Sequence, residues 1–132
     1  MKFFTIAELC KSTTADRLGI NNRCRQEHVT ALTALVDNVL DPLREWWGKP
    51  ITVNSGYRCP ELNAAVKGSK TSQHMVGEAA DIDTGDRQQN KLLFEYIRKN
   101  LPYDQLIDES NFAWVHVSYR ADGANRKQVL KL

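Results

Sequence analysis

Cysteine and histidine are scarce in this chain of 132 residues, which contains three of each. No two cysteines are spaced as C-x-x-C, so a zinc site built from cysteine pairs is not expected. Cys10, Cys24 and Cys59 are an odd number, and the simplest interpretation is a reduced, cytosolic chain.

Long apolar runs and excess charge are also lacking. The N-terminal segment is interrupted by Glu8 before a secretion signal could form, so we expect a chain that is cytoplasmic as synthesised and not inserted in a membrane. The net charge is only +2, and no basic stripe carries interleaved aromatic residues. A nucleic-acid partner is therefore not expected.

The composition is that of a soluble globular protein. Hydrophobic residues make up 42% and charged residues 26% of the chain, and neither a repeat nor a linker divides it. The length matches one domain, so we expect residues 1–132 to form a single domain. We also expect a monomer.

Periodicity predicts helices first and strands later. Apolar residues recur at helical spacing over 26–47, with an interruption at Pro42, and again near 86–100. Further expected helices begin near Thr5, Thr14 and Pro60, and the expected strands are 51–54, 79–83, 104–108, 113–119 and 128–130. This order favours an α+β fold with a mainly antiparallel central sheet flanked by helices.

Two of the three histidines lie in a frame with an aspartate. His74 precedes Asp81 by a short segment that contains Gly77, and His116 follows far downstream in a strand-like run. Two neighbouring strands could present Asp81 and His116 to one point, with His74 arriving from a loop. Imidazole and carboxylate ligands suit a catalytic zinc, which keeps one position open. Structural histidines in apolar strands are the alternative.

Three motifs surround these residues: SGYR at 55–58, S-x-H-x-x-G-x-A-x-D at 72–81 and W-x-H at 114–116. Together they resemble the zinc D-Ala-D-Ala carboxypeptidase family, which has the Hedgehog/DD-peptidase fold and includes phage endolysins. The resemblance runs from about residue 51 to 119. The segments at 3–9 and 40–43 are similar to its small phage-type branch.

The resemblance implies a zinc metallopeptidase that hydrolyses a bond in the peptidoglycan stem peptide. The bond would be D-Ala-D-Ala, for a carboxypeptidase, or L-Ala-D-Glu, for an endolysin-like endopeptidase. His74, Asp81 and His116 match the Zn²⁺ ligands. Arg58 matches the substrate-binding arginine, and Ser72 matches a serine that lies near the substrate and is also expected to bind it. Such an enzyme would act on the cell wall after release from the cell.

One position departs from the family pattern. Many members carry a catalytic acid three residues before the last histidine, where this chain has Ala113. The small branch has an upstream block similar to the segment at 104–109, which makes Glu109 the candidate general base. An ordinary charge at the end of a hairpin is the alternative. Asp108 would face the opposite side of the strand.

The sequence is also compatible with two other functions. Ala113 is also compatible with a non-catalytic, zinc-bearing cell-wall-binding module. A structural phage or cell-wall component could use the same fold as a scaffold only. The hydrolase differs from both in requiring an acid beside the metal.

Overall fold

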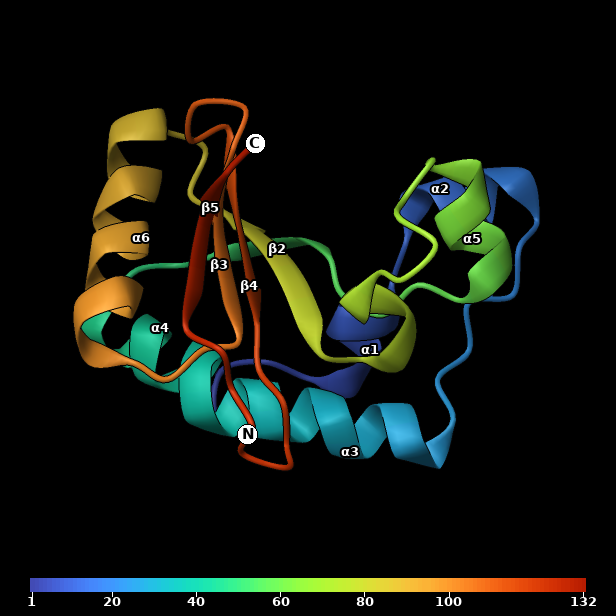
Figure 1. Ribbon diagram of the computed structural model, residues 1–132. Helices are drawn as coiled ribbons and strands as arrows, with labels where there is room; N and C mark the ends of the chain where they lie inside the picture. Colours follow the sequence, from blue (N-terminus) through green and yellow to red (C-terminus); the bar gives the residue numbers. More distant parts are fainter.

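The computed structural model describes residues 1–132 (Figure 1). The α-helices are α1 (Ile6–Cys10), α2 (Thr13–Leu18), α3 (Gln26–Leu35), α4 (Asp41–Trp47), α5 (Pro60–Ala65) and α6 (Arg87–Asn100). A π-helical turn, η1 (Val36–Leu40), joins α3 to α4, and a 3₁₀ turn, η2 (Gln73–Val76), precedes the second strand. The strands are β1 (Thr52–Ser55), β2 (Ala79–Asp83), β3 (Gln105–Glu109), β4 (Trp114–Ser118) and β5 (Gln128–Lys131).

The five strands form one sheet in the order β1-β2-β4-β3-β5. Its first three pairings are antiparallel, and only β5 runs parallel to its neighbour β3. The predicted α+β fold with a mainly antiparallel sheet is therefore confirmed. The strands β2 and β4 lie at the centre, so residues on them are held from both sides by backbone hydrogen bonds.

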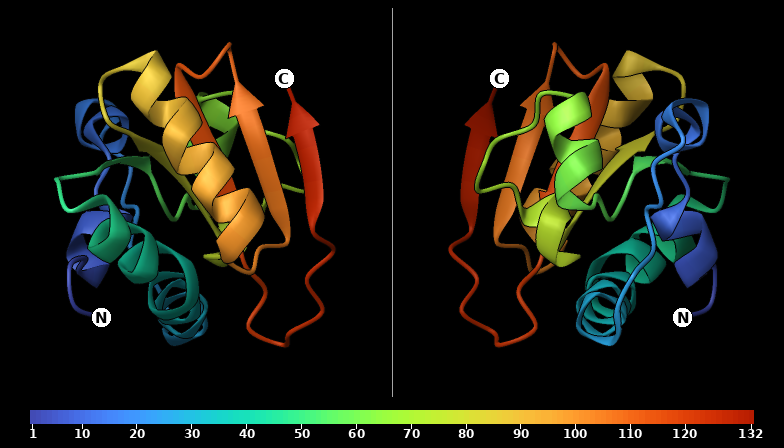
Figure 2. Two further views of the ribbon diagram at one scale, coloured as in Figure 1. Left: turned by 90° about the vertical axis from the view of Figure 1, so that its left-hand side faces the viewer. Right: turned by 90° about the vertical axis from the view of Figure 1, so that its right-hand side faces the viewer.

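The two faces of the sheet differ in chemistry. One face is apolar, and α6 packs against it through Leu93, Phe94 and Ile97 (Figure 2). The strand residues of that core are Ala80, Ile82, Leu106, Val115 and Val117. Because successive side chains of a strand alternate, the residues between them point to the opposite face. That second face is polar, and α5 lies on its side of the sheet.

The long helical pattern over 26–47 forms as three consecutive pieces. The π-helical turn η1 lies just before Pro42, which occupies the first turn of α4. Proline has no N–H and is accepted in a first helical turn, so the predicted interruption at Pro42 is confirmed. The helix α4 ends at Gly48, whose φ of 72° is left-handed. None of the helices combines the length and apolar character needed to cross a membrane.

The expectation of a reduced chain is wrong for two of the cysteines. Cys10, at the end of α1, forms a disulfide with Cys24, just before α3, and Cys59 stays free. Asn22 holds the same region by donating to the carbonyls of Cys10 and Tyr57. An odd number of cysteines does not reveal which two the fold brings together.

Candidate metal centre

His74 is carried by the turn η2 rather than by an irregular loop. The Ser72 hydroxyl accepts a hydrogen bond from the His74 N–H and caps the start of the turn. Gly77 ends it with a φ of 79°, a conformation that favours glycine. A Cβ at Gly77 would also lie 2.8 Å from the carbonyl oxygen of His28. The turn is therefore fixed at both ends.

Asp81 and His116 lie directly opposite each other on the central strands β2 and β4. Both point to the polar face, because their neighbours Ala80, Ile82, Val115 and Val117 are in the core. The sequence predicts that two adjacent strands bring these residues to one point. The pairing register of β2 and β4 shows that they do.

The three side chains converge on one carboxylate oxygen. Asp81 Oδ1 lies 3.3 Å from His74 Nε2 and 3.0 Å from His116 Nδ1. The possible ligand atoms of the three residues all lie within 4.8 Å of one another. Burial acts to raise the pKa of Asp81, but the hydrogen bond with His116 and the adjacent His74 side chain outweigh it and place the pKa well below its usual range.

The protonation of His74 fits a metal ligand. Its Nδ1 lies 2.7 Å from the carbonyl oxygen of Gly56, which can only accept, so Nδ1 carries the proton. The other nitrogen, Nε2, is buried and has no hydrogen-bond partner. A buried imidazole lone pair of this kind, oriented through the opposite ring nitrogen, is what a metal requires of a histidine.

Arg58 is anchored next to the histidines. Its Nε donates to Ser55 Oγ and its Nη1 donates to Asn63 Oδ1, while Nη2 lies 3.8 Å from Asp81 Oδ2. The side chain is 13% exposed. Burial lowers the pKa of Arg58, and the carboxylates of Asp81 and Glu109 oppose this effect. The guanidinium is thus oriented, at little entropic cost, toward the candidate metal ligands His74, Asp81 and His116, called the metal group below.

Glu109 reaches the same face from β3. It pairs with Trp114, two residues before His116, so it is a diagonal neighbour of His116. Burial and the Asp81 carboxylate raise the pKa of Glu109, while the two histidines act in the opposite direction. The Trp114 indole N–H also lowers it, from a position short of a full hydrogen bond. An acid with a raised pKa beside Asp81 and the two histidines is a candidate general base.

Asp108 and Ala113 are not part of this group. Asp108 is buried on the other side of the strand, where it accepts a hydrogen bond from the Phe112 N–H. Ala113 lies in the turn between β3 and β4. The hairpin thus places Glu109, and neither of these residues, on the face that carries His116.

A cavity of about 610 Å³ joins the predicted site residues. It is lined by Arg58, Ser72, His74, Asp81, Glu109 and His116 among others. A larger cavity of about 780 Å³ lies beside Cys24, His28 and Tyr57, and none of the predicted site residues lines it. The possible metal-ligand atoms, rather than the volume, make the first cavity the candidate site.

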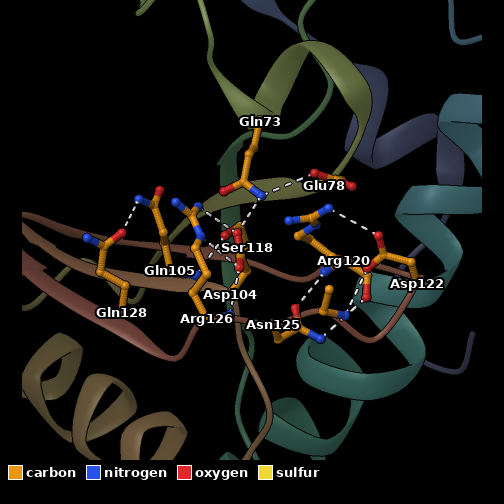
Figure 3. A network of polar contacts seen from close by, with 11 residues as sticks. Gln73, Glu78, Asp104, Gln105, Ser118, Arg120, Asp122, Asn125, Arg126 and Gln128 are labelled. Carbon is orange, nitrogen blue, oxygen red and sulfur yellow. Dashed lines mark hydrogen bonds and ion pairs between the residues drawn. The ribbon is translucent and has the colours of Figure 1, made fainter.

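Several residues that build this cleft are not predicted from the sequence. Asn63 is buried, accepts from Arg58 and donates to the Ser69 carbonyl. Gln73, Asp104 and Arg126 form a polar network at the other end (Figure 3). Gln73 is adjacent to His74 in the sequence, and Asp104 is the first residue of the segment 104–109 that contains Glu109. Nothing in the sequence indicates that Gln73, Asp104 and Arg126 contact one another.

An open cleft with a His–Asp–His group, a neighbouring acid and an anchored arginine is the arrangement of a metal-dependent hydrolase. Comparison with known proteins gives the family. The model of the peptidase M15 family matches residues 2–118, and the chain belongs to this family.

One curated relative is the zinc D-Ala-D-Ala carboxypeptidase of Streptomyces albus G. It is 38% identical over 76 residues, which cover 50% of this chain. The match covers only 30% of the relative's length.

Proposed function

We propose that this protein is a zinc metallopeptidase that hydrolyses a bond in the peptidoglycan stem peptide. The observation that carries the proposal is the unpartnered, buried Nε2 of His74, which is aimed at Asp81 beside His116. His74, Asp81 and His116 would hold the zinc. Membership of the peptidase M15 family and the likeness to a zinc carboxypeptidase support the metal and the reaction.

Each polar residue of the cleft has a role in this reaction. Zinc, when bound, supplies the Lewis acidity that polarises a scissile carbonyl and acidifies the attacking water. Glu109 takes a proton from that water and returns it to the leaving amine, for which its raised pKa is suited. Arg58 offers a planar fork to a carboxylate or carbonyl of the peptide. Ser72 fixes the turn of His74 and lines the cleft.

The shape of the cleft supports a peptide that extends to both sides of the cleaved bond. A second cavity of about 270 Å³ shares Arg58 and Asp81 with the main one and continues toward Ser12 and Asn54. Room on both sides favours an endopeptidase of the endolysin kind over an enzyme that accepts only a terminal dipeptide. The enzyme would act on the cell wall after release, in an oxidising environment in which the Cys10–Cys24 disulfide is stable.

A second candidate is a non-catalytic, zinc-bearing cell-wall-binding module. Ala113 favours it, because the usual acid of the family pattern is missing there. The position of Glu109 on the same face as His116 favours the enzyme. The two candidates differ in whether zinc-loaded protein cuts the wall or only binds to it.

The test is mass spectrometry of purified sacculi after digestion by wild type with zinc, wild type with a chelator, and His116→Ala. Zinc content is measured in each sample. Defined peptides should appear with zinc-loaded wild type alone, and their masses name the bond. If zinc-loaded wild type binds sacculi of every common chemotype without releasing peptides, the binding module is the correct function.

A further inference from the structure

The cleft has a second arginine that the family match does not include. Residues 119–132 lie beyond the matched segment, yet Arg126 and Leu130 from this part line the same cavity as the metal group. Arg58 follows β1 at one edge of the sheet, and Arg126 precedes β5 at the other. Asp81 on β2 and His116 on β4 therefore lie between the two edges of the sheet that carry these arginines.

A buried carboxylate orients Arg126. Asp104 is fully buried and accepts from three donors of Arg126: the backbone N at 2.8 Å, Nε at 3.0 Å and Nη2 at 2.7 Å. This bidentate pairing fixes the plane of the guanidinium, while its Nη1 makes no hydrogen bond within the chain. The Arg126 side chain is 52% exposed. Its free edge is thus available to a ligand (Figure 3).

The same carboxylate ties Arg126 to the metal group. Asp104 Oδ2 also accepts from Gln73 Nε2 at 2.9 Å, and Gln73 stands next to His74 in the turn η2. The Gln73 amide donates to Glu78 as well, so it links the residue before β2 to Asp104, the residue before β3. One buried group therefore sets the position of Arg126 relative to His74.

We infer that Arg126 is a specificity residue that binds a free carboxylate of the substrate peptide at the β5 side of the metal group. The inference rests on the proposed function and adds to it a preference for an acidic over an amidated peptide. A peptide carboxyl loses its charge and one acceptor oxygen when it is amidated, so the two forms present different chemistry to Arg126. An ion pair with Asp104 for stability alone would create no such preference.

The test uses pairs of stem peptides that differ only in one carboxyl group, free or amidated. Wild type should show a kcat/KM about tenfold higher for the acid, the size of one charge-assisted hydrogen bond at a half-exposed site. Arg126→Gln should lose this preference through a higher KM for the acid, with an unchanged kcat on the amide. Arg126→Lys, which keeps the charge but not the fork, should lie between them.

Arg120→Gln is the matched control. Arg120 lies in the same connection, pairs with Asp122 and does not line the cavity of the metal group, so its variant should keep the wild-type preference. Thermal melting and zinc content check that each variant is folded and loaded. Equal losses on acid and amide with Arg126→Gln, or no loss on either, would overturn the inference while leaving the hydrolase intact.

A binding experiment keeps the two proposals separable. Calorimetry with the Glu109→Gln variant measures affinity for the acid and amide peptides without turnover. Adding Arg126→Gln should weaken binding of the acid about tenfold and leave the amide unchanged. If the added Arg126→Gln leaves the affinity for the acid unchanged, the inference about Arg126 is wrong. If wild type cleaves no peptide, the proposed function is wrong, and the inference about binding is still tested by calorimetry.

Discussion

At the residue scale, the site depends on partners that hold polar groups in place. Gly56 orients His74 through its carbonyl, and Asn63 and Ser55 orient Arg58. Glycine is required at position 56, because a Cβ there would collide with the backbone carbonyl of Leu9. The functional groups thus reach their positions through neighbours that carry no chemistry themselves.

Asp104 should make stability depend on pH. Hydrogen bonds from Arg126 place the pKa of Asp104 at about 2, below its ordinary value. Because the pKa is lowered by folding, the contribution of the Asp104 carboxylate to the free energy of unfolding is complete above its unfolded pKa of roughly 4. This contribution is lost as the pH falls toward 2. Asp104→Asn should therefore cost about 1–2 kcal/mol of unfolding free energy at pH 7, since Arg126 is half exposed.

Urea unfolding of both zinc-free proteins between pH 7 and pH 2 measures this effect. The difference in unfolding free energy between wild type and Asp104→Asn should become smaller as the pH falls from 5 to 2. Other acids, including Asp81, titrate in both proteins and cancel in the comparison. A difference that stays constant over this range would show that the Asp104 charge is not what stabilises the fold.

At the element scale, the sequence predicted much of what positions the site. The strand at 79–83, the hairpin and the helix near 86–100 were all expected, because each has clear periodicity and clear ends. The turn η2 was expected as a loop, since its four residues are too few for a periodic pattern. Its capping by Ser72 and Gly77 is local chemistry that only the backbone geometry reveals.

Gly77→Ala tests the importance of that turn. The substitution places a Cβ at a positive φ and 2.8 Å from the His28 carbonyl oxygen, so we expect a cost of about 2–3 kcal/mol. Displacement of His74 should also weaken zinc binding about tenfold. Thermal melting and competition with a chromogenic chelator measure the two effects.

Gly123→Ala is the control for this variant. Gly123 has a φ of 80° but no atom within 4 Å of an added Cβ, so only the backbone strain of about 1 kcal/mol is expected. Its zinc affinity should equal that of wild type. If the two variants lose zinc affinity equally, the contact between η2 and α3 does not position His74.

At the scale of the whole molecule, long-range pairing explains what the sequence could not show. His74, Asp81, His116 and Glu109 are predicted from motifs; the sheet places the last three on one face, and the turn η2 brings His74 to them. The Cys10–Cys24 disulfide and the contact of Arg126 with Asp104 join segments that share no pattern. Such contacts depend on the path of the loops in three dimensions, which no local sequence pattern predicts.

In the proposed function, zinc held by His74, Asp81 and His116 acts together with the neighbouring Glu109 to hydrolyse peptidoglycan. The most direct measurement is digestion of sacculi by zinc-loaded wild type and Glu109→Gln, with the zinc content of each protein determined in parallel. Both proteins should hold one zinc, and the variant should release peptides at least 100-fold more slowly. If the variant holds zinc and cuts as fast as wild type, Glu109 is not the general base.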